Sequence, residues 1–248
     1  MEVNFGTDVA SARPHFGAPG IRHFRMVRGG CSTGLRYAFS GARNAWSDTM
    51  TEMLDGGKGS VVASVGFARA PFAAALSTLL DWRRNLGASP RVTEVDGERS
   101  VVASLSPERH PWSTEAMLRC DGDDWTAYVN EGADPWPATS FVARRLSTDA
   151  VVAVHSVNPP HASTQFQLIG PTGEPPRLYV RTLAAHCEDG RWKWYANGRQ
   201  QPFEDPHRYS ARRIKDRLNR PLLMQYLSAL GIETDRSNFV GGGVIITK

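Results

Sequence analysis

The sequence predicts a mixed α+β protein, and three observations support this fold class. Short β-prone runs, separated by Gly, Pro and Asp turn signals, predict antiparallel meanders. Stretches with apolar residues at helical spacing lie between these runs, and the order strand, helix, meander occurs twice. The composition, with 41% hydrophobic and 22% charged residues in 248, is ordinary for a globular protein. We therefore expect an internal duplication of two strand–helix–antiparallel-meander units, followed by a C-terminal amphipathic helix and an edge strand.

The chain is expected to divide into four parts. Residues 1–59 are rich in Gly and Arg and show no sustained periodicity, which predicts an irregular N-terminal segment. Residues 60–122 form the first unit and residues 123–203 the second. One strand–helix–meander unit is too small to bury both its helix and its sheet face, so we expect the two units to pack together. Residues 204–248 supply the C-terminal helices and strand, which we expect to pack on the second unit.

The first unit begins with a strand at 61–65. Pro71 then opens a helix, because the fixed φ of proline suits a first helical turn, and Gly87 ends it. Strands are expected next at 91–95, 99–105 and 114–120. Asp–Gly pairs follow the first and the last of these strands and favour tight turns.

The second unit repeats this order. A strand at 125–129 precedes a helix that Asp134 and the following prolines cap and that extends to Leu146. Further strands are expected at 150–155, 164–169, 178–185 and 191–196, with hairpin signals at Asp189-Gly190 and Asn197-Gly198. A shared spacing supports the duplication, and its members are Cys120, Trp125, Tyr128 and Asn130 against Cys187, Trp192, Tyr195 and Asn197.

The C-terminal part predicts two helical pieces and a strand. Asp205 and Pro206 form a cap and a first-turn proline, and apolar residues at helical spacing continue until Pro221 interrupts. A second helix at 222–230 ends at Gly231. The final strand, at 239–247, contains three consecutive glycines, which predict an edge, a bulge or a close approach of another backbone.

Positive charge is concentrated in one segment. The whole chain has a net charge of +4, yet nine basic residues and three acids lie between residues 191 and 220. Three of the arginines recur at helical spacing after residue 206, which predicts an amphipathic helix with a basic exterior. We expect this segment to bind an acidic partner, and the residues predicted to do so are Arg191, Lys193, Arg208, Arg212, Arg213, Arg217 and Arg220.

The same segment interleaves aromatic and basic residues, which leaves a second interpretation open. Rings beside cations are typical of surfaces on which nucleic-acid bases stack next to phosphate contacts. On a strand, however, Trp192 and Trp194 share one face, while Lys193 and Tyr195 share the other. A half-buried antiparallel strand requires this pattern too, and we favour that interpretation, with the tryptophans in the core and the cations on a solvated face.

Motifs for catalysis, metals and cofactors fail on their spacing. Cys31 is followed by Arg36 one position too early for a phosphate-cradling cysteine loop, and the glycines before Lys248 lack the order of a nucleotide-binding loop. The seven histidines form no pair at metal-ligand spacing, and no Gly-x-Ser-x-Gly sequence is present. We expect neither a metal nor a cofactor. An enzyme whose site is assembled from sequence-distant residues remains the alternative.

The segment from Gly190 through Gln201-Pro-Phe-Glu-Asp-Pro206 to Leu230-Gly-Ile232 resembles a group of uncharacterised actinobacterial proteins. That resemblance implies a bacterial cytoplasmic protein and no catalytic residue. The three cysteines, an odd number and widely spaced, favour the reducing cytoplasm. The lack of a long apolar run favours a protein with no membrane partner. We therefore predict a non-enzymatic protein that binds a macromolecular partner, with immunity proteins that neutralise toxins as an analogy of fold. The oligomeric state stays open.

Overall fold

The structure is a computed structural model of the whole chain. It describes residues 54, 63–96, 105, 114–120, 124–130, 134–157, 161–232 and 242–247. All of these residues belong to one compact unit, Ala45–Lys248.

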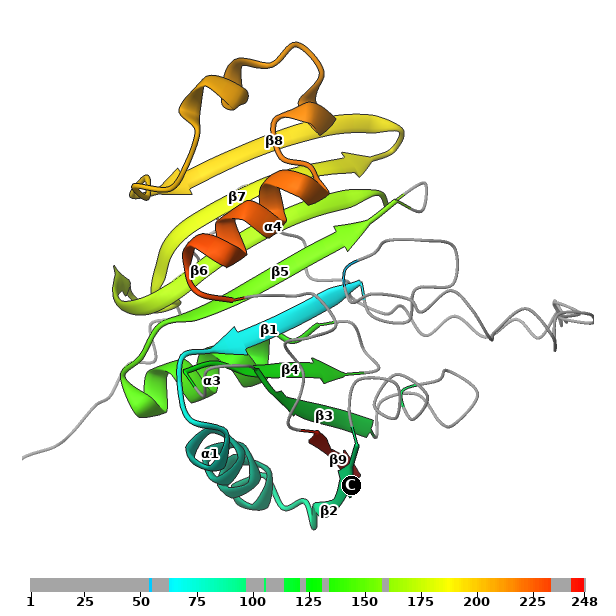
Figure 1. Cartoon of the computed structure of the whole chain (residues 1–248), viewed down its shortest axis with the longest axis vertical. Coiled ribbons are helices and arrows are strands. Elements are labelled where there is room, and N and C mark those ends of the chain that lie inside the picture. The colour runs from blue at the N-terminus through cyan, green and yellow to red at the C-terminus, as the bar shows by residue number, and fades with distance from the viewer. Residues whose placement is uncertain are drawn as a thin grey trace, which may run out of the picture. The chain divides into compact units, whose positions relative to one another are not determined.

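The described residues form one nine-stranded sheet in which all neighbouring strands are antiparallel (Figure 1). Its strand order is β2-β9-β3-β4-β1-β5-β6-β7-β8. The strands are β1 (Ser64–Ala68), β2 (Arg91–Val95), β3 (Thr114–Arg119), β4 (Thr126–Asn130), β5 (Ala150–Ser156), β6 (Ser163–Glu174), β7 (Tyr179–Glu188), β8 (Arg191–Gly198) and β9 (Gly243–Thr247). Strands β5 to β8 follow one another as a meander, so β8 is the last strand of the sheet on that side.

Three α-helices lie among the described residues: α1 (Phe72–Asn85), α3 (Trp136–Leu146) and α4 (Arg220–Ala229). Pro71 precedes α1, and Gly87 follows it with φ +82°, as the sequence predicts. Asn219 caps α4 by accepting a hydrogen bond from the Leu222 amide, and Pro221 occupies the first turn rather than interrupting a helix.

The helices cover opposite faces of the sheet. Alternate residues on a strand point to opposite faces, so Leu118 and Met117 on β3 belong to different cores. Leu118 lies in the core that includes Leu223 of α4, whereas Met117 packs with Leu79 of α1 and Val142 of α3. We call these two sides the α4 face and the α1/α3 face. Figure 1 shows α4 lying across the meander strands.

The core under α4 is aromatic. Phe166 of β6 is fully buried, and its ring meets those of Tyr226 and Phe203 edge-on, with centroids 5.8 and 6.0 Å away. Tyr226 is 1% exposed. Edge-to-face rings at this separation attract beyond the area that they bury. This cluster therefore fixes α4 and the chain before it onto the meander.

Helix α3 approaches the sheet closely at Gly66 of β1. A β-carbon at this position would lie 1.9 Å from the Oγ1 atom of Thr139 and 3.2 Å from the β-carbon of Pro135. Only glycine leaves room for the helix here. The short side chains of β1 and α3 thus set the depth of the α1/α3 layer.

The mixed α+β class is confirmed, but the internal duplication is not. The strands that flank α3, β4 and β5, are separated in the sheet only by β1, whereas three strands separate β1 from β2. The equivalence of two tryptophans also fails, because Trp125 is 4% exposed and donates to the Leu230 carbonyl, while Trp192 is half-buried on the outermost strand. The predicted strand at 99–105 lies outside the described residues except for Leu105, which is buried in a turn.

The prediction of a C-terminal edge strand is wrong. Strand β9 pairs with β2 on one side and with β3 on the other, so it lies inside the sheet. The close backbone approach expected from its glycines is present, since a β-carbon on Gly243 would lie 2.4 Å from the Met117 carbonyl oxygen. The glycines therefore allow insertion between two strands instead of marking an edge.

The predicted basic helix after residue 206 is also wrong. The chain forms two short 3₁₀ helices, Pro206–Ser210 and Ile214–Asp216, before α4 begins at Arg220. The expected cap is real, because Asp205 accepts a hydrogen bond from the His207 amide. Tyr209 in the first of these 3₁₀ helices packs on Trp194 of the sheet, so a tertiary contact takes the place of a continuous helix.

Candidate binding surface

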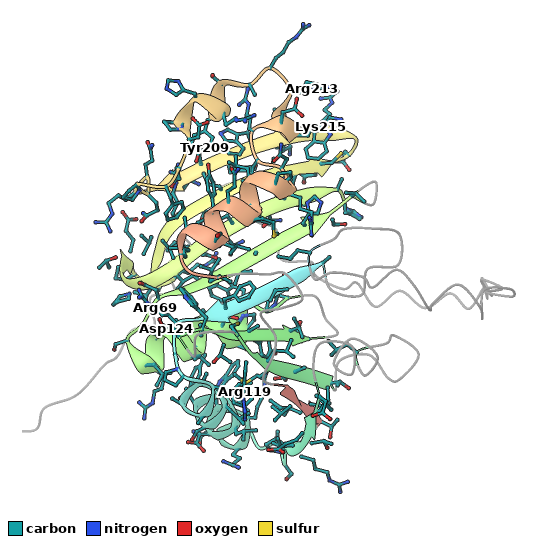
Figure 2. All side chains as sticks on the ribbon, viewed as in Figure 1. Arg69, Arg119, Asp124, Tyr209, Arg213 and Lys215 are labelled. Carbon is teal, nitrogen blue, oxygen red and sulfur yellow. The ribbon has the colours of Figure 1, made fainter. Side chains whose placement is uncertain are left out.

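The segment between β8 and α4 covers the end of the α4 face. Tyr209 packs against Trp194 of β8, with ring centroids 5.1 Å apart, and Phe203 packs against Phe166. Figure 2 shows Tyr209 close to Arg213 and Lys215 at the β8 end of the sheet, away from Arg69. This segment carries most of the cations that the sequence singles out.

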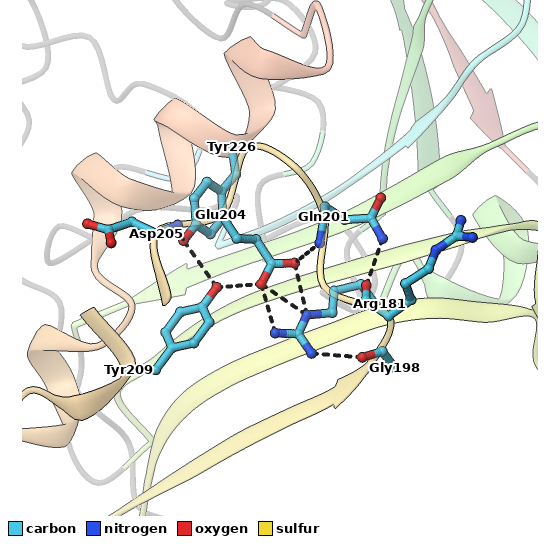
Figure 3. Close-up of polar contacts among 8 residues, drawn as sticks. Arg181, Gly198, Gln201, Glu204, Asp205, Tyr209 and Tyr226 are labelled. Atoms are coloured by element: carbon cyan, nitrogen blue, oxygen red, sulfur yellow. Dashed lines mark hydrogen bonds and ion pairs between the residues drawn. The ribbon is translucent and has the colours of Figure 1, made fainter. Parts of the chain in front are cut away.

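A buried ion pair ties the segment to the sheet (Figure 3). The Arg181 guanidinium of β7 donates from Nη2 to Oε2 of Glu204 at 2.7 Å and from Nε to Oε1 at 2.9 Å. The Arg181 and Glu204 side chains are only 7% and 0% exposed. Such a planar, two-point pair holds direction as well as charge. The third guanidinium nitrogen donates to the Gly198 carbonyl at 3.0 Å.

The Glu204 carboxylate receives further donors from its own segment. The Gln201 backbone N–H donates at 2.8 Å and the Tyr209 hydroxyl at 2.6 Å. The Tyr209 and Tyr226 hydroxyls are 3.2 Å apart, and the Tyr226 oxygen accepts from the Asp205 amide. Burial, together with the hydrogen bonds to Glu204 and Tyr226, raises the pKa of Tyr209 far above its usual value. Both charges of the pair are thus satisfied internally, which indicates a structural role.

The structure places the predicted partner-binding residues on both sides of β8. Arg191 and Lys193 alternate with the core-facing tryptophans, so they point to the α1/α3 face. The predicted arginines from Arg208 onward lie in the segment on the α4 face and in the first turn of α4. The predicted partner-binding residues therefore border one edge of the sheet but do not form a single helical stripe.

Two of the predicted arginines are engaged with the backbone. Arg217 donates from Nε to the Ala211 carbonyl at 2.9 Å, and Arg220 donates from Nε to the Leu54 carbonyl at 2.9 Å. Both side chains are half-buried. Their guanidinium groups hold loops in place, which was not evident from their spacing.

Every acid of the segment 191–220 is matched by a cation. Glu204 pairs with Arg181, Asp205 with Arg208 at 3.6 Å, and Asp216 with Arg213 at 2.6 Å. Lys193 is likewise paired with Glu188 of β7. Among the described residues of this segment, 191–220, the exposed cations left without an acidic partner are Arg191, Arg199, Arg212 and Lys215.

We call Arg191, Arg199, Arg212 and Lys215 the basic rim: Arg191 begins the outer strand β8, Arg199 directly follows it, and Arg212 and Lys215 lie in the segment between β8 and α4. Arg191 and Arg212 were predicted from the sequence, whereas Arg199 and Lys215 were not. The signal for the missed pair was their place in the same charged segment. What distinguishes them from Arg208 and Arg213 is ion pairing, which no spacing rule reports.

The aromatic residues of the segment are engaged in packing. Trp192 and Trp194 lie against the α4-face core, and Trp194 also contacts Tyr209. On the other face, the Tyr195 ring stacks on His186 with centroids 5.2 Å apart and planes 4° apart. Base stacking requires an accessible ring face. The core interpretation of the tryptophans is therefore confirmed.

Other reactive groups do not gather into a second centre in the described residues. Burial raises the pKa of the Cys120 thiol to about 12, although a hydrogen bond with the Ala127 backbone lowers it. Among the described side chains, no group of three His, Cys, Asp or Glu residues could hold a metal ion. Cys31 lies outside the described residues.

None of the helices that the structure describes is long and apolar enough to cross a membrane. Comparison of the chain with protein families, with curated proteins and with solved structures gave no match.

Proposed function

We propose that this protein is a non-enzymatic binding protein of the bacterial cytoplasm that recognises the acidic surface of a protein partner through its basic rim. The observation that carries the proposal is the charge balance around β8. After each acid of the segment has been paired, four exposed cations remain, and they lie in β8 and in the segment that follows it.

Unpaired surface cations are suited to recognition because their field extends into solvent. Over a Debye length of about 8 Å at physiological salt, they attract an acidic surface and orient it before contact. Ion pairs formed on the rim would add to the rate of association more than to the lifetime of the complex. A toxin–immunity or bacterial-conflict setting fits such fast, charge-guided recognition.

The rigidity of the surface supports the same function. The segment that carries Arg212 and Lys215 is anchored below by the Arg181–Glu204 pair and by the Trp194–Tyr209 contact. Cations on a fixed backbone lose less entropy on binding than cations on a loose loop. The buried network thus serves recognition by presenting the rim in one arrangement.

The protein interpretation is favoured over nucleic acid by the use of the rings. Trp192 and Trp194 are packed toward the sheet core rather than presented beside the cations. On a nucleic acid, the basic rim would therefore contact the phosphates by charge alone, without stacked bases. Nucleic acid is therefore an outcome of the test below and not part of the proposal.

A pair of matched charge reversals tests this function. The site variant is Arg212→Glu with Lys215→Glu, and the control variant is Arg69→Glu with Arg91→Glu. All four residues are exposed, and both variants change the net charge equally. Figure 2 shows Arg69 far from Lys215, so the control leaves the rim intact.

Each protein is used to capture partners from the native host, and the captured protein is then purified and its affinity measured. Wild type and control should bind one acidic protein with equal affinity, and the site variant should bind it at least tenfold more weakly. Equal affinity for all three, or capture of nucleic acid alone, would contradict the proposal.

A further inference from the structure

A groove between α1 and α3 forms a second candidate site, far along the sheet from the rim and independent of the function proposed above. Its volume is about 550 Å³, within the range of roughly 300–1,000 Å³ that small-molecule sites occupy. Both helices line it, and the residues are Thr78, Asp81, Trp82, Arg84 and Asn85 of α1 with Phe141 and Arg145 of α3. The α1 members recur three or four positions apart and so share one side of the helix.

The floor of the groove is aromatic and fixed. The Trp82 and Phe141 rings stack with centroids 4.7 Å apart and planes 12° apart. The Arg83 guanidinium lies 4.3 Å from the centre of the Trp82 ring. Arg83 is itself bound to the buried Glu115 of β3, with nitrogen and oxygen 2.6 Å apart. The indole is therefore held in place before any ligand arrives.

The polar edge of the groove has an excess of positive charge. Asp81 pairs with Arg84 at 2.9 Å, so these two charges cancel. Arg145 has no ion pair or hydrogen bond to another described residue, and neither do the Asn85 and Thr78 side chains. One cation and two neutral polar groups thus converge on an apolar floor, which is the chemistry of a site for an amphipathic anion.

We propose that this groove binds a ligand that joins a flat apolar group to a carboxylate. The apolar group would pack against the open edge of the Phe141–Trp82 stack, because the facing surfaces of the two rings cover each other and the Arg83 guanidinium lies over the indole. The carboxylate would take a two-point hydrogen bond from Arg145, because a planar guanidinium matches a carboxylate in shape and charge. Two sources share this chemistry: a free aryl carboxylate, and the C-terminal residue of a peptide that ends in an aromatic amino acid.

The test is a titration of ¹⁵N-labelled full-length protein, followed through the Trp82 indole N–H resonance, which a Trp82→Phe variant assigns. The probes are benzoate against benzamide, and acetyl-Gly-Phe with a free carboxylate against the same peptide amidated. The carboxylate of each pair should shift the Trp82 resonance saturably, and its neutral counterpart should not. Stronger binding of the free peptide than of benzoate identifies a peptide C terminus as the source, and the reverse order identifies a small molecule.

Two arginines of α3 provide a matched comparison. Arg145→Gln removes the unpaired cation and should weaken binding of the better carboxylate at least tenfold, because a two-point, charge-assisted pair is lost. Arg144→Gln changes the neighbouring exposed arginine, which does not line the groove and whose Nε donates to the Ser140 carbonyl. Its affinity should match wild type.

The proposal is overturned if neither carboxylate shifts the Trp82 resonance, or if benzamide and benzoate bind alike. It is also overturned if both arginine variants bind as wild type does. None of these results depends on the basic rim, because the rim residues are unchanged in every protein used.

Discussion

Removing the arginine of the buried pair should destabilise the protein far more than removing an exposed one. Arg181→Met leaves the Glu204 carboxylate, which is 0% exposed, with no cation. A buried charge stripped of its partner typically costs about 3–5 kcal/mol of unfolding free energy. For a domain of this size, that loss lowers Tm by roughly 6–20 °C. Figure 3 shows the Arg181 guanidinium against this carboxylate.

Removing both charges should restore much of the loss. In Arg181→Met with Glu204→Leu, the Gln201 amide and the Tyr209 hydroxyl still lose their acceptor, at about 1 kcal/mol each. The double variant should therefore be destabilised by about 2 kcal/mol, less than the single variant. Arg208→Met is the control, because its pair with Asp205 is 3.6 Å long and about half exposed, so it should cost under about 0.5 kcal/mol.

Urea unfolding followed by tryptophan fluorescence measures all three free energies. The expected order of destabilisation is Arg181→Met, then the double variant, then Arg208→Met. If Arg181→Met and Arg208→Met were equally mild, or if the double variant were no more stable than the single one, the view of Glu204 as a desolvated carboxylate that needs Arg181 would be refuted.

Three further outcomes follow from the packing and the titrating groups. Gly66→Ala should destabilise by about 1–3 kcal/mol because its β-carbon meets Thr139, and Thr139→Ala should recover part of that loss in the same urea assay. A soluble aromatic disulfide at pH 8 should label Cys120 only after unfolding, as peptide mass spectrometry would detect, since burial raises its pKa to about 12; labelling of the native protein would contradict this. Burial lowers the pKa of His186, so the unfolded chain binds its proton more readily and stability should fall as pH drops below about 6.5. His186→Gln should flatten that part of the stability curve, and an unchanged curve would argue against it.

Local signals predicted the elements that local forces determine. Pro71 and Gly87 correctly predicted the two ends of α1, because proline and glycine act through their own backbone preferences. Asp189 and Gly190 form the expected hairpin, with φ of +53° and +75°. Asn197-Gly198 carries the same signal, and Gly198 also has a positive φ. The chain nevertheless leaves the sheet there, because Glu204 and Tyr209 hold the next segment on the α4 face.

The strand order and the 3₁₀ segment could not be predicted because they depend on distant contacts. Strand β9 enters the sheet between β2 and β3, which no property of its own five residues specifies. The apolar positions after residue 206 fit a helix, but Tyr209 packs on Trp194 instead of on a helical neighbour. Periodicity cannot separate these outcomes, since both bury the same residues.

The basic surface was found only in outline. Sequence spacing identified the charged segment but gave Arg217, Arg220 and Arg212 the same predicted role in binding. Arg217 and Arg220 donate to backbone carbonyls, whereas Arg212 has no partner among the described residues. Lys215 was left out although it is exposed and unpaired. Ion pairing depends on where each acid folds, so it appears only in three dimensions.

The association rate of the captured acidic partner with the purified protein, measured across a salt series, tests the central claim most directly. For wild type and for Arg69→Glu with Arg91→Glu, the rate should be high at low salt and fall steeply as salt is added. For Arg212→Glu with Lys215→Glu, it should be slow at low salt and nearly independent of salt. Three identical salt profiles would contradict recognition through the basic rim.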